Sequence, residues 1–449
     1  MKKLLSFILT ILSCAGLFAA CDREDSSSAP KEVDYAAAVT LDMESTETIK
    51  QVTTVKLFID GDTTHFNVPT NVSVTGNGVL KARYLAINTP ESTGKIEEWG
   101  KAASKFTRSK LESATSIVLE TDGNKWELDS TGGRHLVWVW YKPEGSDSYR
   151  NLNIEILQEG LAIASDSEGN RYGETCGKAL RQATALKKHV HGDEVDPDFY
   201  YGDAIPLDLK TLRLNIADYD GQKVAFEGVI THLYNSGAYL ESYDDETEQW
   251  YGMYVYYGYN TNPFLGEVIV PGNKLRIVGT VSYYEAGGKY QVSGIEYNMR
   301  NPDDPNSCKL LDEENKYDPA NVETTAAMFF GKKRIQLQDE DTATEYDYTA
   351  LAMETSISMK DLRVVSTYTT NNGGDSDGSI SITCSIGDRT ITVRTDVLKD
   401  ADGKLVTEDI FTIGKKIDVK GVIDYYQPDG SDTGYYQIKV FNIEDITIH

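Results

Sequence analysis

The stretch Arg83-Tyr-Leu-Ala-Ile-Asn-Thr-Pro-Glu91 decides how the rest of the chain is interpreted. An arginine heads the apolar run 84–87, which is typical of a short buried strand, and a polar turn follows it. Pro90 biases Thr89 to an extended conformation, so Glu91 is expected to leave the strand at a defined angle. The sequence therefore predicts a strand that delivers polar side chains to one end of a sheet.

A second strand and turn lie upstream. The run Val55–Ile59 is of strand type and leads into Asp60-Gly-Asp62, a tight turn in which glycine is expected to supply unusual backbone dihedrals. If the two strands are neighbours, Asp62, Asn88 and the carbonyl of Thr89 converge as hard oxygen ligands. Such a set suits calcium, which accepts carboxylate, amide and backbone oxygens in loose geometry.

Three motifs in this order resemble the staphylococcal nuclease-like (thermonuclease) family, over roughly residues 50–195. They are Asp60-Gly-Asp-Thr63, the arginine-led strand that ends at Glu91, and Gly133-Arg134. In that family the second motif ends in Asp-Thr-Pro-Glu and the third is Tyr-Gly-Arg. Each motif alone is weak, and their order, with a helix expected between the second and third, carries the resemblance.

The resemblance implies a Ca²⁺ ion held by the carboxylate of Asp62 and the carbonyl of Thr89. Asn88 completes the predicted metal ligands, and it stands where the family usually has an aspartate. An amide oxygen still ligates calcium, but the site loses one negative charge, which is worth on the order of a few kcal/mol at an effective dielectric constant of about 20. We therefore expect weaker calcium binding, with loss of activity as the sharper alternative.

The resemblance also implies the chemistry: hydrolysis of phosphodiester bonds in DNA and RNA. Glu91 is expected to orient or deprotonate the attacking water, and Arg83 and Arg134 to clamp the phosphate, because bidentate guanidinium geometry matches phosphate oxygens. Gly132 stands where the family has a tyrosine. The family's tyrosines near the nucleotide have no clear counterpart in residues 162–167, so base stacking is expected to differ.

The first 20 residues resemble a secretory signal, with two lysines before an apolar run that is too short to span a membrane. Ala19-Ala-Cys21 resembles a lipobox, which makes Cys21 the expected lipidated N-terminus and residues 21–48 an acidic and serine-rich tether. Asp22–Asp25 resembles the acidic tag that directs some lipoproteins to the outer face of the outer membrane. We expect a lipid-anchored protein of the outer membrane, exposed at the cell surface; the alternative is a plain secretory signal with an incidental cysteine.

The chain has 449 residues and a formal net charge of -26. This balance is unusual for a partner of nucleic acid, because phosphates attract basic residues. Residues 46–195 are close to neutral, however, so most of the acidic excess lies in the C-terminal half. Beyond the signal and the lipid site, Cys176, Cys308 and Cys384 are too few and too widely spaced to predict a disulfide framework or a zinc site.

Residues 49–195 are expected to form an α+β domain, a five-stranded barrel with helices in the oligonucleotide-binding (OB) arrangement. Helical patterns cover 97–113, 151–160 and 175–191. His189 and His191 lie two residues apart at a helix end and do not face one another, so solvated histidines are favoured over a metal site. His135, beside Arg134, is the better candidate for a contact with the site.

A repeat marks the remainder of the chain. Gly272–Tyr284 matches Gly414–Tyr426 at the glycines, one lysine, the alternating apolar positions and a tyrosine pair. The sequence therefore predicts a mainly β protein, in which two tandem OB-like β-barrel modules at 204–300 and 318–449 follow the nuclease-like domain.

Two functions other than catalysis are open: binding of nucleic acid and binding of polysaccharide. A surface lipoprotein with a weakened or silent site would bind nucleic acid or polysaccharide through its β modules. A stacking platform in the first module is one basis for this, since aromatic rings bind bases; cross-strand pairing within a tyrosine-rich sheet is the favoured alternative. The candidate rings are Tyr251, Tyr254, Tyr256, Tyr257 and Tyr259. Retention of Glu91 among two arginines favours the enzyme, because a pure binder does not need a water-activating carboxylate there.

Overall fold

The computed structural model describes residues 32–258, 263–301, 303–312, 316–337, 342–372, 374, 376–428, 431 and 433–449. The expected signal, Cys21 and Tyr259 lie outside the described residues. Within the part of the chain that is described, no helix is long and apolar enough to cross a membrane.

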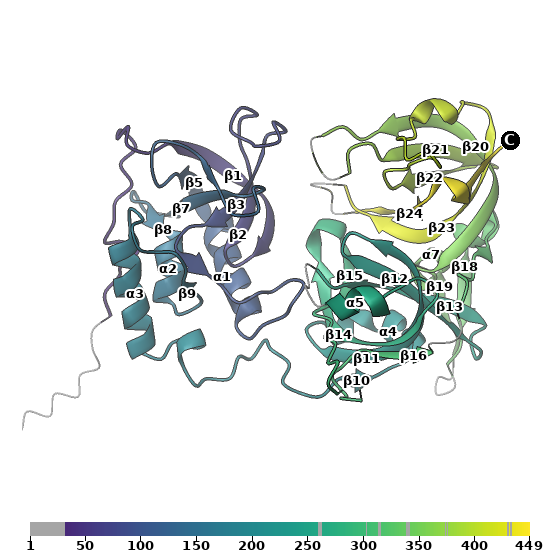
Figure 1. Cartoon of the computed structure of the whole chain (residues 1–449), viewed down its shortest axis with the longest axis horizontal. Helices are drawn as coiled ribbons and strands as arrows, with labels where there is room; N and C mark the ends of the chain where they lie inside the picture. The colour runs from purple at the N-terminus through teal and green to yellow at the C-terminus, as the bar shows by residue number, and fades with distance from the viewer. Residues whose placement is uncertain are drawn as a thin grey trace, which may run out of the picture. The chain divides into compact units, whose positions relative to one another are not determined.

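The first barrel contains five main strands and is closed by one parallel pair, between its third and fifth strands (Figure 1). The strands are β1 (Lys50–Asp60), β2 (Thr63–Asn67), β3 (Val79–Tyr84), β5 (Ala114–Glu120) and β7 (His135–Pro143). Short strands β4 (Ile87–Asn88), β6 (Glu127–Leu128), β8 (Arg150–Asn151) and β9 (Ile163–Ala164) accompany them. The helices are α1 (Gly100–Glu112), α2 (Leu152–Gln158) and α3 (Gly173–Ala185), followed by the 3-10 turn η1 (His189–His191).

Strand β7 forms the centre of this core, because both of its faces are buried. Trp138 and Trp140 on one face and Val137 and Val139 on the other are all 0% exposed. The buried side chain of Asn153 in α2 ties this strand to the residue after β3, since its amide nitrogen donates to the carbonyls of Leu85 and Val137 at 2.9 and 3.1 Å. The strand that precedes the predicted site is thus fixed to the body of the barrel.

The second and third barrels repeat the topology of the first, again with a parallel pair between the third and fifth strands. The second contains β11 (Lys223–Tyr234), β12 (Gly237–Asp244), β13 (Gln249–Tyr256), β14 (Lys274–Tyr284) and β15 (Lys289–Ser293). The third contains β20 (Ser356–Thr369), β21 (Ile380–Ile386), β22 (Arg389–Thr395), β23 (Lys416–Tyr426) and β24 (Tyr435–Val440). The protein is therefore mainly β, with three OB-type barrels, as the sequence predicts.

Shorter elements flank these two barrels. Around the second are β10 (Ile205–Pro206), α4 (Leu209–Leu214), η2 (Ile216–Tyr219), α5 (Pro263–Val268), η3 (Glu285–Gly287) and β16 (Lys309–Asp312). Around the third are β17 (Val322–Glu323), α6 (Ala326–Phe329), β18 (Lys332–Ile335), β19 (Thr344–Asp347), α7 (Tyr348–Leu351), η4 (Glu408–Ile410), η5 (Ile443–Asp445) and β25 (Ile446–Ile448).

The sequence repeat coincides with the fourth strand of each barrel, β14 and β23. A Cβ added at Gly279 would lie 2.7 Å from the carbonyl oxygen of Ser293, and one at Gly421 would lie 2.2 Å from that of Lys439. Each repeated glycine therefore lets the fifth strand approach closely where the barrel closes.

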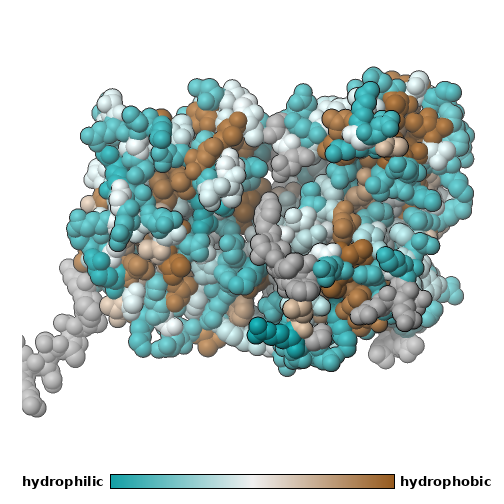
Figure 2. Space-filling view, viewed as in Figure 1, coloured by the Kyte–Doolittle hydropathy of each residue, from teal (hydrophilic) through white to brown (hydrophobic). Residues whose placement is uncertain are grey.

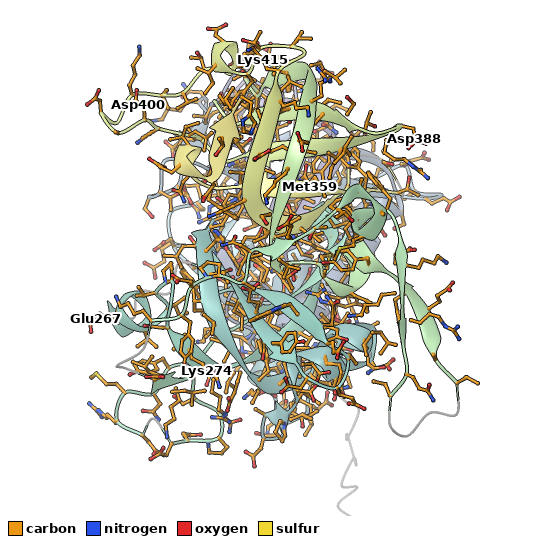
Figure 3. The ribbon with its side chains drawn as sticks, turned by 90° about the vertical axis from the view of Figure 1, so that its right-hand side faces the viewer. Glu267, Lys274, Met359, Asp388, Asp400 and Lys415 are labelled. Carbon is orange, nitrogen blue, oxygen red and sulfur yellow. The ribbon has the colours of Figure 1, made fainter. Side chains whose placement is uncertain are left out.

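Polar loops surround these barrels. In Figure 3 Met359 lies on β20 of the third barrel, where it is 1% exposed, whereas Asp388 and Asp400 lie on loops outside it. The face in Figure 2 is largely hydrophilic, with separate hydrophobic patches. The described cysteines, Cys176, Cys308 and Cys384, are buried and free.

A buried ionic cluster joins the second and third barrels. Arg213 of α4 and Glu354, which precedes β20, are 4% and 0% exposed at their side chains, and Arg213 Nη2 donates to Glu354 Oε2 at 2.5 Å. The backbone N–H of Tyr254 donates to the same oxygen at 2.9 Å. Lys289 in the second barrel pairs with Asp424 in the third.

The prediction for the third helix was partly wrong. Helix α3 ends at Ala185, because Lys187 and His189 take positive φ values of 53° and 41°. The two histidines are half-buried and each lies against a backbone carbonyl: His189 Nδ1 is 2.7 Å from the carbonyl oxygen of Glu159, and His191 Nε2 is 3.1 Å from that of Ala162. They attach the chain after α3 to the end of α2.

Candidate active site

The arginine-led strand is broken rather than continuous. The sequence predicts a strand through residue 87, but β3 ends at Tyr84, and Ala86 has a left-handed φ of 66°. The chain then resumes as β4, in which Asn88 pairs with Ile163 of β9. This break turns Asn88 back toward Arg83, whose guanidinium donates to Asn88 Oδ1 at 2.5 Å.

Asp62 is the centre of the site. Its side chain is 1% exposed, and the guanidinium of Arg83 binds its Oδ1. Its other oxygen, Oδ2, accepts the backbone N–H of Thr89 at 2.9 Å, while its carbonyl accepts that of Tyr84 at 2.9 Å. The structure thus brings together Asp62, Arg83, Asn88 and the backbone N–H of Thr89.

Gly61 is required for a reason that the sequence did not reveal. It was expected to supply an unusual dihedral, but it does not adopt a positive φ. A Cβ at this position would lie 2.8 Å from both Ala103 Cβ and Thr89 Cγ2, closer than side chains can approach. The carbonyl of Gly61 also accepts the hydroxyl of Thr107 at 2.6 Å. Glycine therefore allows helix α1 to pack directly against the turn.

Glu91 lies beside a second buried carboxyl group, Asp60, to which it is hydrogen-bonded. Burial, and then repulsion by Asp62 and Glu91, holds the pKa of Asp60 well above its usual range. Burial followed by repulsion from Asp62 also raises the pKa of Glu91. Sequence analysis missed Asp60 as a site residue, although its place in the Asp-Gly-Asp turn was a usable signal.

The backbone of Glu91 is fixed by the segment that leads into α1. Its N–H donates to Glu97 Oε2 at 3.1 Å, and its carbonyl accepts the N–H of Glu97 at 2.9 Å. A Cβ at Gly100 would meet the carbonyl oxygen of Glu91 at 2.2 Å. The start of the helix thus sets where Glu91 stands.

Arg134 precedes β7 and is held within its own loop. Its Nε donates to Asp129 Oδ2 at 2.7 Å, and the side chain is 34% exposed. The parallel register of Ala82 with His135 sets Arg134 opposite Lys81, two positions before Arg83 on the neighbouring strand. The guanidinium of Arg134 is oriented by Asp129 and open to solvent.

His135 is a core residue rather than a site contact. It is 5% exposed, and its ring packs edge-on against Trp126 with 5.6 Å between centroids. Burial lowers its pKa, which favours the neutral ring. The expected contact with the site is not formed, because the ring is buried against Trp126.

Residues 81–190 match the family model of staphylococcal nuclease homologues. The chain contains a staphylococcal nuclease-like domain. The match begins after β1 and β2, but strand pairing joins both strands to the same barrel, so Asp60 and Asp62 belong to the domain. The first barrel is thus of a nuclease-type family. No curated protein matches the chain.

The donor set of the nuclease-like domain suits a hard cation. Three carboxyl groups, those of Asp60, Asp62 and Glu91, gather around one guanidinium, so negative charge exceeds positive charge. In the described part of the chain, no three His, Cys, Asp or Glu side chains are already arranged as a metal site. The oxygens of Asp62 and Asn88 are instead bound by Arg83. The chemistry of these residues therefore fits calcium, with Arg83 as a competing cation.

The tyrosine platform of the second barrel is not formed as considered. Tyr251 and Tyr254 are 0% and 7% exposed, and the hydroxyl of Tyr254 donates to the carbonyl of Tyr234 at 2.8 Å. Both rings are buried. Tyr254 packs on its cross-strand partner Tyr239 with 5.0 Å between ring centroids, as in the cross-strand alternative, whereas Tyr251 lies opposite Ser242. The tyrosines of β13 are compatible both with an exposed platform and with buried cross-strand packing, so the sequence could not distinguish the two.

Proposed function

We propose that this protein is a calcium-dependent nuclease that hydrolyses phosphodiester bonds of DNA and RNA. The observation that carries the proposal is the cluster of Asp62, Arg83 and Asn88 beside Glu91, within a domain of a nuclease-type family. Phosphoryl chemistry needs fixed positive charge and a positioned water, and this cluster offers groups for both.

Each residue has a role in this proposal. Asp62, Asn88 and the carbonyl of Thr89 would hold the cation, which when bound supplies positive charge toward the phosphate oxygens. Arg83 and Arg134 bind the phosphate through their N–H groups. Glu91 accepts a hydrogen bond from the attacking water and fixes its direction, because its own backbone is held by the start of α1.

The proposed location is outside the cytoplasm, with a lipid on Cys21 that anchors the protein in the outer membrane. This part rests on the sequence of residues 1–25. Radiolabelled palmitate fed to cells that express the chain is expected to label it. Cys21→Ser is expected to remove the label, and persistent labelling of that variant would refute the anchor.

The activity is tested by hydrolysis of single-stranded DNA in a calcium titration, from micromolar to tens of millimolar, with the full chain. Glu91→Gln is expected to lose activity while keeping its fold. Glu168→Gln removes an exposed carboxylate of the same domain and is expected to retain activity. If the full chain is inert at every calcium concentration but still binds DNA, the protein is a binder on a nuclease frame and the enzyme proposal is wrong.

A further inference from the structure

A cavity of about 300 Å³ lies away from the nuclease-like domain, where β13 meets β18 and the short helices α6 and α7. Trp250 of β13, Lys332 and Lys333 of β18 and Tyr348 of α7 are among the residues that line it. Small-molecule sites span roughly 300 to 1,000 Å³. The cavity therefore has room for one small ligand rather than for a polymer.

Trp250 supplies a flat aromatic wall. It is half-buried and pairs across the sheet with Tyr243, with ring centroids 5.3 Å apart. Trp250 thus lines the cavity and packs against Tyr243. An aromatic face in this setting stacks well on a planar ring of a ligand.

Two lysines give the cavity positive charge. Lys333 Nζ donates to the carbonyl of Glu248 at 2.8 Å and to Gln249 Oε1 at 3.0 Å, which leaves one of its three hydrogens for another acceptor. Among the described residues no carboxylate oxygen lies within 4 Å of this ammonium. Lys332 has only a long, exposed pair with Glu345 at 3.8 Å.

The charges that border the cavity favour an anion. Lys332 and Lys333 line the cavity together with one acidic residue, Glu248, and Lys332 is already paired with Glu345 at 3.8 Å. Lys333 is therefore the cation of the cavity that has no carboxylate within 4 Å among the described residues. Glu248 has a left-handed φ of 47°, and its carbonyl accepts a hydrogen bond from Lys333. Burial lowers the pKa of Lys333, and a bound anion would offset that cost.

We propose that this cavity binds one nucleoside monophosphate, with the base against Trp250 and the phosphate at Lys332 and Lys333. A tryptophan and an ammonium group without a carboxylate partner in one cavity favour a small anion that carries a planar ring. The choice of a nucleotide among such anions rests on the proposed function, because hydrolysis of nucleic acid releases this class of molecule.

Isothermal titration of the full chain carrying Glu91→Gln with adenosine 3′-monophosphate, in EDTA, tests the proposal. Lys333→Gln and Trp250→Ala are each expected to weaken binding at least fivefold. Trp250→Phe keeps an aromatic ring and is expected to bind nearly as well. Lys360→Gln, which removes an exposed lysine of the third barrel, is expected to change nothing.

Titrations with other ligands show which chemical groups the cavity recognises. Adenosine and inorganic phosphate are each expected to bind at least tenfold more weakly than the nucleotide, and glucose is expected not to bind. Equal binding of adenosine and nucleotide, binding of glucose, or affinity that is unchanged in both Lys333→Gln and Trp250→Ala would overturn the proposal.

The proposed function is separated from this site by assaying hydrolysis. Lys333→Gln in the otherwise unchanged chain is expected to cleave DNA at the original rate, because Lys333 lies outside the nuclease-like domain. Nucleotide binding by a chain that never cleaves DNA would support the cavity and refute the nuclease. Cleavage of DNA without nucleotide binding at Lys333 would support the nuclease and refute the cavity proposal.

Discussion

Asn88 accepts a hydrogen bond from the guanidinium of Arg83 at 2.5 Å, and the same guanidinium binds the carboxylate of Asp62. Arg83 thus bridges two of the residues proposed to hold calcium. One of these residues is neutral, so the arginine and a cation compete for the single full charge of Asp62. This relationship makes the identity of residue 88 the main control over the proposed calcium requirement.

Asn88→Asp is expected to lower the calcium concentration for half-maximal DNA hydrolysis at least tenfold. A charge added about 4 Å from the cation is worth up to about 4 kcal/mol at an effective dielectric constant of 20, and Arg83 neutralises part of it. Asn124→Asp makes the same change on an exposed loop of the domain and is expected to have no effect. An unchanged or raised calcium requirement in Asn88→Asp would refute the metal assignment.

Gly61→Ala is expected to lower both stability and activity. The new Cβ would lie 2.8 Å from Ala103 Cβ and Thr89 Cγ2, so either α1 or the Thr89 backbone must shift. Overpacking of this kind costs about 1–3 kcal/mol. Urea unfolding followed by tryptophan fluorescence measures the loss, since four of the five tryptophans lie in the nuclease-like domain.

The matched control for this change is Gly123→Ala. An added Cβ at Gly123 meets nothing within 4 Å, and its φ is not positive. We expect less than about 0.5 kcal/mol of change for this exposed substitution. Equal losses in the two variants would show that Gly61 is not needed for close packing.

Much of the site could be predicted because motif order fixes which strands carry Asp62 and Arg83. The break at Ala86 could not be predicted, since alanine has no propensity for a left-handed backbone and the surrounding packing imposes it. The role of Gly61 could not be predicted either, because the contact that requires glycine is made with helix α1, which is distant in the sequence. Burial of Tyr254 also depends on partners outside its own strand, such as Tyr234 and Glu354.

Glu354→Gln is expected to destabilise the pair of C-terminal barrels by about 3 kcal/mol. It leaves Arg213, which is 4% exposed, without a carboxylate partner in a buried setting. Breaking a buried ion pair from one side costs about 3–5 kcal/mol, and the carbonyl of Gly252 still accepts from Arg213. Differential scanning calorimetry is expected to show a lower midpoint for these barrels and an unchanged one for the nuclease-like domain.

Glu323→Gln provides the comparison for the buried pair. Its partner is Lys360 at 3.4 Å, and the two side chains are 71% and 58% exposed. Exposed pairs contribute about 0–1 kcal/mol, so the midpoint is expected to stay nearly constant. If Glu354→Gln behaves like Glu323→Gln, the cluster at the junction does not hold the barrels together.

His65 is expected to make the nuclease-like domain sensitive to acid. Burial, and then repulsion by Lys81, lowers the pKa of this β2 residue from 6.5 to about 4. The unfolded chain therefore binds a proton between pH 6.5 and 4 that the folded chain does not, so this contribution to stability is present above pH 6.5 and is lost as pH falls to 4. The loss is on the order of 2 kcal/mol, allowing for partial exposure of the ring.

Urea unfolding at pH 7, 5.5 and 4.5 measures this loss of stability. His65→Gln cannot titrate and is expected to show a smaller decline than the unchanged chain, whereas His191→Gln, in the same domain, is expected to retain the full decline. The same decline in His65→Gln as in the unchanged chain would assign the acid sensitivity to other groups.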